Sequence, residues 1–180
     1  MNKQVLGNAF QKHKIRRGYP HRYEQLYRDI NERRGAPTSI FEIGVGAGHC
    51  LLAWRDAYPN ALIMGLEKDK RLVETSINNQ FRITQYDATK DGVSVEVGEV
   101  WDLMVDGTDA PIEDRIQIFH NLVMNTRTYV VETLEKEEVP LLRTAMKQHG
   151  LTDVITYTSA AHRNQPLTPW YSLVLYNNKT

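Results

Sequence analysis

The stretch Glu42-Ile43-Gly44-Val45-Gly46-Ala47-Gly48 decides the fold of this chain. An apolar run that begins at Ser39 leads into it, which is typical of a buried parallel strand. A helical pattern follows it, over residues 51–58. Glycines at a strand-to-helix junction let the backbone turn tightly and approach a ligand closely. The stretch therefore predicts a ligand-binding turn at the carboxyl end of a first strand.

Strand and helix patterns alternate along the rest of the chain. Further strands are expected at 61–67, 81–86, 100–106, 128–132, 152–158 and 170–176, and helices at 21–34, 69–79, 112–124 and 135–149. This alternation predicts an α/β fold, a Rossmann-like, doubly wound and mostly parallel seven-stranded sheet with helices on both faces. No helix pattern separates the last two strands, so the last strand should be antiparallel. Pro140 indicates that its helix starts late or is kinked.

The composition is that of one globular domain. The 180 residues are 41% hydrophobic and 24% charged, with no net charge. No apolar run approaches the roughly 20 residues of a membrane-spanning helix, and the N-terminus has no apolar signal core. The single cysteine, Cys50, excludes an intrachain disulfide framework. We therefore expect a cytoplasmic protein without a membrane partner.

The glycine spacing distinguishes between kinds of nucleotide site. A dinucleotide fingerprint from Gly44 would need a third glycine where His49 stands, and no phosphate-loop string occurs. The remaining pattern, E-x-G-x-G-x-G, resembles the first motif of class I S-adenosylmethionine-dependent methyltransferases. Acids also end the next two predicted strands, at Glu67 and Asp87. Taken singly, Glu67 has a plainer interpretation as a helix cap and Asp87 as the start of a turn.

The resemblance implies a set of cofactor-binding residues. A carboxylate at Glu67 can accept both ribose hydroxyl hydrogens, and the family often uses an acid such as Asp87 for the adenine amino group. The full implied set is His21, Tyr23, Glu42, Gly44, Gly46, Gly48, Glu67, Asp87 and Asp106.

A narrower resemblance rests on residues on both sides of the glycines. The segments 21–27 and 52–61 look like the macrocin and mycinamicin type of sugar O-methyltransferases and the related cephalosporin hydroxylase-like group. That group shows D-D-G-S-H after the fourth strand and E-D after the fifth, which hold magnesium. Here the fourth strand continues Asp106-Gly107-Thr108-Asp109, and Thr133 follows Glu132. Asp106 and Asp109 are thus the candidate catalytic residues, and Asp106 with Glu132 a weak candidate site for Mg²⁺.

Charge and a break in the sequence suggest how the chain is organised. Residues 1–36 contain nine Lys or Arg against three Asp or Glu, whereas residues 86–138 contain four against thirteen. A Gly-Ala-Pro break ends the basic part. We expect 1–36 to be a basic N-terminal helical segment or lid, and 37–180 to be the S-adenosylmethionine-binding Rossmann-like domain.

Three functions are consistent with these features. The first is O-methylation of a small-molecule hydroxyl, in a chain so short that the acceptor pocket should be shallow or completed by the partner subunit of a homo-oligomer. The second is a non-catalytic cofactor-binding or scaffold protein, suggested by the incomplete motif after the fourth strand. The third is a nucleic-acid or protein methyltransferase that docks through the basic segment, although zero net charge argues against nucleic acid.

Overall fold

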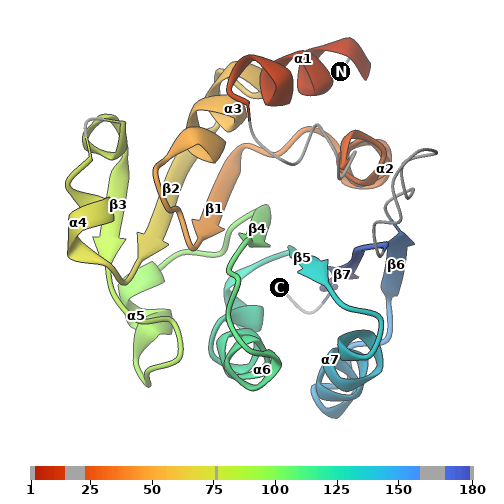
Figure 1. The fold of residues 1–180 in the computed structure, drawn as a ribbon. Coiled ribbons are helices and arrows are strands. Elements are labelled where there is room, and N and C mark those ends of the chain that lie inside the picture. The colour runs from red at the N-terminus through yellow and green to blue at the C-terminus, as the bar shows by residue number, and fades with distance from the viewer. Residues whose placement is uncertain (1–2, 15–22, 76, 159–168, 179–180) are drawn as a thin grey trace.

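The structure is a computed structural model that describes residues 3–14, 23–75, 77–158 and 169–178. Its elements, in chain order, are α1 (Lys3–Lys12), α2 (Glu24–Arg34), β1 (Ser39–Ile43), α3 (His49–Ala57), β2 (Leu62–Glu67), α4 (Lys70–Val73), the 3₁₀ turn η1 (Asn78–Gln80), β3 (Arg82–Gln85), α5 (Val93–Val97), β4 (Leu103–Asp106), α6 (Ile112–Leu122), the 3₁₀ turn η2 (Val123–Asn125), β5 (Thr128–Leu134), α7 (Glu138–Gln148), β6 (Val154–Thr158) and β7 (Tyr171–Tyr176). Figure 1 shows their arrangement.

The seven strands found in the described residues form one sheet, in the order β3-β2-β1-β4-β5-β7-β6. The first five strands pair in parallel, and β7 pairs antiparallel with both β5 and β6. The order reverses between β1 and β4, which is where an open α/β sheet forms a ligand crevice at its carboxyl edge. The predicted fold class and the antiparallel last strand are confirmed.

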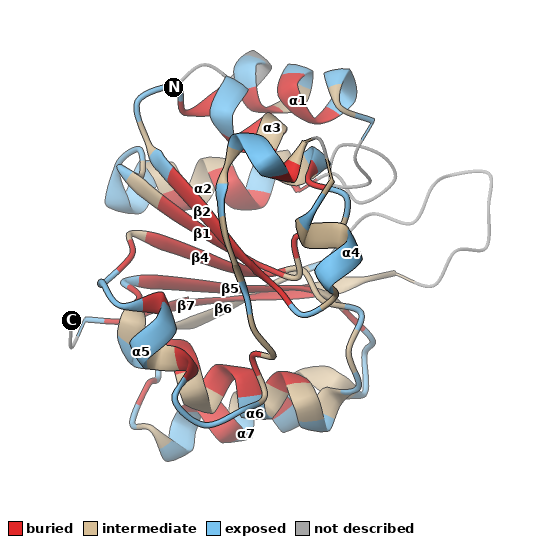
Figure 2. Cartoon of the chain, turned by 90° about the vertical axis from the view of Figure 1, so that its left-hand side faces the viewer, coloured by how far each residue is buried: buried red, intermediate tan, exposed pale blue. Residues whose placement is uncertain are grey.

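Two helical layers bury the sheet. Figure 2 shows the buried strands between α1, α2 and α3 on one face and α5, α6 and α7 on the other. The first face has an aromatic cluster in which the Trp54 ring lies 4.8 Å from that of Tyr27 and 5.6 Å from that of Phe10. The second face has a larger cluster that includes Trp101, Phe119 and Met146. Strands β1, β2, β4, β5 and β7 contribute side chains to both clusters, as the pleat of a sheet buried on both faces requires.

The N-terminal helices belong to this core. Leu6 and Phe10 of α1 are buried with Tyr27 and Ile30 of α2 in the same cluster as β1 and β4 residues. The expected boundary after residue 36 therefore does not divide the described core. Among the described residues, no helix combines the length and the apolar character that a membrane crossing requires.

Several element boundaries differ from expectation. The helix expected over 69–79 is only the short α4, followed by a turn into η1. Helix α5 was not expected, and α1 was expected only as an unspecified part of the helical segment 1–36. Helix α7 begins at Glu138, which puts Pro140 in its first turn, where a missing N–H costs nothing.

Candidate functional site

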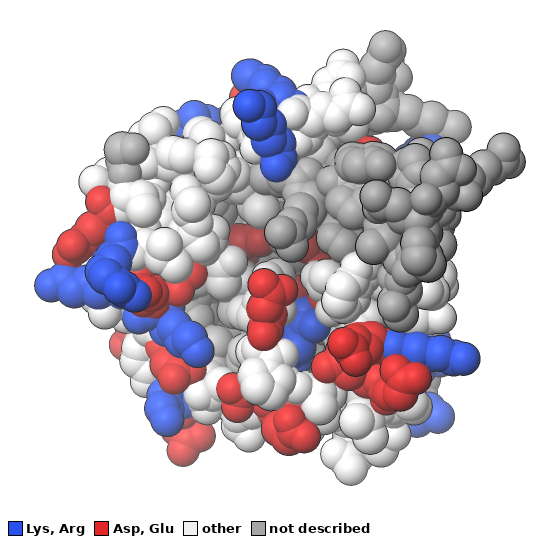
Figure 3. All heavy atoms as spheres, viewed as in Figure 1, with Lys and Arg blue, Asp and Glu red and all other residues white. Residues whose placement is uncertain are grey.

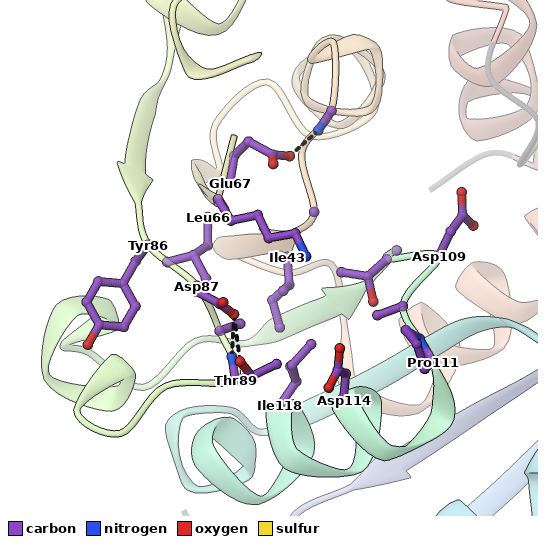
Figure 4. Close-up of a pocket in the computed structure, with 17 residues that line it drawn as sticks. Ile43, Leu66, Glu67, Tyr86, Asp87, Thr89, Asp109, Pro111, Asp114 and Ile118 are labelled. Atoms are coloured by element: carbon purple, nitrogen blue, oxygen red, sulfur yellow. Dashed lines mark hydrogen bonds between the residues drawn. The ribbon is translucent and has the colours of Figure 1, made fainter. Parts of the chain in front are cut away.

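A cavity of about 400 Å³ opens at the carboxyl ends of β1, β2, β3 and β4. This volume lies within the usual range for small-molecule sites. Figure 4 shows side chains from these strand ends and from α6 around it. The cavity is lined by Ile43, Gly44, Gly46, Leu66, Glu67, Lys68, Tyr86, Asp87, Ala88, Thr89, Gly107, Thr108, Asp109, Ala110, Pro111, Asp114 and Ile118.

The glycine turn forms one wall of this cavity. Gly44, Gly46 and Gly48 all have left-handed backbone angles, with φ of 77°, 57° and 85°. A Cβ atom on Gly44 would lie 2.7 Å from Cγ2 of Thr108, and one on Gly48 would lie 2.1 Å from Oδ1 of Asn78. A Cβ atom on Gly46 would meet nothing within 4 Å. Gly46 is therefore the position at which the backbone is open to a ligand, whereas Gly48 serves packing and does not line the cavity.

Glu67 fixes the turn from the end of β2. Its Oε2 accepts a hydrogen bond from the backbone N–H of Gly46 at 2.9 Å, and its Oε1 accepts one from the N–H of Asp69 at 3.0 Å. Each carboxylate oxygen has two acceptor positions, so both oxygens retain one for a ligand hydroxyl. The side chain is 7% exposed and lines the cavity. Glu67 thus shapes the turn and also presents acceptors to the cavity.

Asn78 is a site residue that the sequence reasoning missed. Its Nδ2 donates to the carbonyl oxygens of Gly46 at 3.0 Å and of Leu72 at 2.6 Å. The residue is buried and ties the glycine turn to the end of α4. Nothing in the local pattern marks it, because an asparagine in a polar turn is most often on the surface.

Asp87 occupies the expected place, after β3 and beside the cavity. Its Oδ1 accepts from the N–H of Thr89 at 3.0 Å and from the Thr89 hydroxyl at 2.8 Å, the pattern of an Asx turn. Burial raises its pKa, but the hydrogen bonds from Thr89 and the charges of Lys68 and Lys90 outweigh burial and leave the pKa lowered. Asp87 is therefore an ionised acceptor at neutral pH.

Asp106 was expected to bind the cofactor and to take part in catalysis, but it is fully buried and does not line the cavity. Its Oδ1 accepts from the N–H of Thr108 at 3.0 Å and from the hydroxyl at 2.6 Å, and its Oδ2 lies 3.7 Å from Nε of Arg115. The buried Arg115 also donates to the carbonyl oxygens of Glu132 and Thr133. Asp106 therefore positions the loop after β4 and is not open to a substrate or cofactor.

Asp106 and Glu132 are not brought together as a metal pair. Asp106 faces α6 on one side of the sheet, while Glu132 accepts a hydrogen bond from the hydroxyl of Tyr27 on the other side. The registers explain this separation: Asp106 pairs with Val131, so Glu132 is one residue further and points to the opposite face. Among the described residues, no group of three or more His, Cys, Asp or Glu could hold a metal ion.

Two other predicted cofactor residues, Glu42 and Tyr23, do not line the cavity. Glu42 is 1% exposed and its Oε2 accepts from the indole N–H of Trp54 at 2.8 Å. Tyr23 is buried, and its hydroxyl accepts from the N–H of Thr133 at 3.1 Å, at the end of β5. Their assignment to the cofactor is thus not supported by the cavity. His21 lies outside the described residues.

Acids dominate the mouth of the cavity. Asp109 is exposed and lines the cavity, as do Asp87 and Asp114, while Lys68 is the one basic residue in the described lining. Figure 3, drawn in the view of Figure 1, shows acidic groups at the centre of this face and most basic groups towards its edge. The mouth therefore favours a cationic or neutral ligand over a polyanion.

No protein-family model matches the sequence, and no curated protein shows significant similarity to it. Solved structures share the fold. The N-terminal domain of human METTL16 in complex with SAH gives a TM-score of 0.61 at 14% identity, covering 87% of this chain and 70% of that chain. The human methyltransferase 10 domain containing protein gives a TM-score of 0.62 at 14% identity, covering 88% of this chain and 83% of that chain. Precorrin-6y C5,15-methyltransferase from Geobacter metallireducens GS-15 gives a TM-score of 0.62 at 11% identity, covering 85% of this chain and 88% of that chain.

The chain has the fold of the class I methyltransferases. Likeness at such low identity carries the fold and not the activity. Another METTL16 structure contains a MAT2A 3′UTR hairpin. The narrower resemblance to the macrocin and cephalosporin hydroxylase-like group is not supported by these comparisons.

Proposed function

We propose that this chain is an S-adenosylmethionine-dependent methyltransferase. The observation that carries the proposal is the cavity itself, in which the open backbone of Gly46 and the carboxylates of Glu67 and Asp87 meet at three successive strand ends. When bound, S-adenosylmethionine supplies a methyl group made electrophilic by its sulfonium. The chain then has to bind this cofactor, orient an acceptor in line with the methyl group and receive a proton.

The cavity residues divide these roles. Glu67 would accept the ribose hydroxyls with the lone pairs that its two backbone hydrogen bonds leave free. Asp87 would accept from the adenine amino group, and the absence of a side chain at Gly46 would leave room for the methionine part. Asp109, exposed at the mouth, is the candidate that receives the acceptor's proton.

We further propose that the acceptor is a small molecule with a hydroxyl group. The acidic mouth supports an acceptor without phosphate. Described basic residues of the N-terminal helices are engaged within the chain, since Lys12 pairs with Asp56 and Arg33 with Asp153. These contacts leave them less available for a polyanion.

Two alternatives remain as rivals with distinct predictions. The first alternative is an RNA acceptor. It is supported by a structural neighbour, the METTL16 catalytic domain, whose structure contains an RNA hairpin. A non-catalytic cofactor-binding scaffold has in its favour the burial of Asp106, which removes one of the two candidate catalytic residues from the cavity.

Calorimetry with S-adenosylhomocysteine is the first test, because micromolar binding is expected and its absence would refute the proposal. Transfer of a labelled methyl group to a panel of small hydroxyl compounds then separates an enzyme from a scaffold. Binding to RNA that falls steeply with salt would favour the nucleic-acid alternative. EDTA should leave turnover nearly unchanged, since the described acids do not form a metal site.

A further inference from the structure

The cavity contains one carboxylate that the roles above do not use. Asp114 lies in the first turn of α6, is partly buried and lines the cavity. Within the described part of the chain, no hydrogen bond or ion pair engages this carboxylate. A partly buried carboxylate without a donor is suited to receive one from a ligand.

Asp114 shares its part of the cavity with Asp87. Figure 4 shows the Asp114 carboxylate rising from α6 into the cavity beside Ile118, with Asp87 and Thr89 across from it. Oδ1 of Asp87 already holds the Thr89 turn, whereas its Oδ2 has no partner among the described residues. Two carboxylates therefore offer free acceptor oxygens to the same end of the cavity, where the apolar side chain of Ile118 also lies.

An amino group on an aromatic ring matches this pair, because its two N–H bonds point in different directions. We propose that Asp114 is a second acceptor for the exocyclic amino group of the bound nucleoside, so that Asp87 and Asp114 together select a 6-aminopurine over a 6-oxopurine. This inference rests on the proposed function and adds a specificity-determining residue to it.

The selection depends on whether the group at the purine 6-position donates or accepts hydrogen bonds. An amino group donates two hydrogen bonds and satisfies both acceptors. A 6-oxo group carries only lone pairs, and the one donor beside it in a 6-oxopurine, the ring N1–H, can satisfy at most one of the two carboxylates, so the other stays without a donor and faces the oxygen. Sites built to hydrogen-bond a particular group reject an analogue without it strongly, because their own polar atoms stay unpaired. The positive charges of Lys68 and Lys90 near Asp87 reduce the repulsion between the two acids.

The test compares S-adenosylhomocysteine with S-inosylhomocysteine, its 6-oxo analogue, by calorimetry. The variants are Asp114→Ala and, as a matched control, Glu113→Ala, which removes an acid from the same helical turn but outside the cavity lining. Melting temperatures and far-UV dichroism establish that each variant is folded.

The wild-type chain should prefer the amino form by at least about fiftyfold. Asp114→Ala should weaken S-adenosylhomocysteine about tenfold, or about 1.4 kcal/mol, and should leave the inosine form unchanged or tighter. Glu113→Ala should change neither. An equal loss for both ligands in Asp114→Ala, or no loss for either, would overturn the role of Asp114 while the proposed function stands. A wild-type chain that binds neither ligand would overturn both.

Discussion

Removal of the Glu67 carboxylate should destabilise the protein before any ligand is added. The side chain accepts backbone N–H groups of Gly46 and Asp69, at 2.9 and 3.0 Å, and is almost fully buried. Glu67→Ala leaves both N–H groups without their acceptor. Hydrogen bonds to charged groups contribute roughly 1.5–3 kcal/mol each, and water can replace part of the bond at the more open Asp69.

We therefore expect a loss of about 3 kcal/mol in the free energy of unfolding, near the lower end for two such bonds. For a chain of this size that corresponds to a fall of about 6–12 °C in melting temperature. Glu67→Gln keeps one carbonyl oxygen as an acceptor, so its melting temperature should lie between those of the wild type and Glu67→Ala. Differential scanning calorimetry measures the melting temperature, and titration with S-adenosylhomocysteine should show at least a tenfold loss of affinity in Glu67→Ala.

Glu74→Ala is the matched control, because Glu74 makes only an exposed i,i+4 pair with Lys70 at 3.6 Å. Such pairs contribute about 0.3–0.5 kcal/mol, so its melting temperature should fall by no more than about 2 °C. If Glu67→Ala melts within 2 °C of the wild type, the two hydrogen bonds do not hold the turn and the reasoning fails.

Three further substitutions probe other parts of the molecule. Gly46→Val should abolish S-adenosylhomocysteine binding in calorimetry, whereas Gly35→Val, at another glycine with positive φ and open space around its Cβ but outside this cavity, should keep it. Asp106→Asn should lower the melting temperature by about 10 °C, since breaking a buried ion pair costs about 3–5 kcal/mol, and should lower turnover more than cofactor affinity. Burial lowers the pKa of His120, so the unfolded chain binds the proton more readily than the folded one, and the free energy of unfolding should fall as the pH drops below about 6.5. In His120→Gln the melting temperature should therefore fall less between pH 7 and pH 5 than in the wild type. An equal fall in the two proteins would contradict this.

The sequence was sufficient to predict the strands that build the site. Apolar runs marked β1, β2 and β4, and the glycines after β1 together with Glu67 and Asp87 after β2 and β3 indicated where a ligand would bind. Helix α5 was missed because its sequence, Val-Ser-Val-Glu-Val, has alternating β-branched residues that favour a strand locally. Burial of Val93 and Val97, four residues apart, overrides that preference in the folded chain.

Side-chain direction was beyond the reach of the sequence. Asp106 and Glu132 both stand at strand ends, but whether they share a face depends on the register between β4 and β5. A shift of one residue would have exchanged the faces. The same holds for Asn78, whose reach to Gly46 depends on how the chain folds back after α4.

Hydrogen bonds hold the peptide groups around Gly46 on both sides: Glu67 accepts from its N–H, and Asn78 donates to its carbonyl oxygen. Ordering one residue of a free loop costs about 1–2 kcal/mol, and here that entropy is lost during folding, before a ligand arrives. Binding should therefore proceed close to lock-and-key, with little rearrangement of the backbone and little entropic penalty from the turn. Replacing Asn78, which holds the turn from outside the cavity lining, would make the turn adapt to each ligand instead, and would shift the heat of binding more than the affinity.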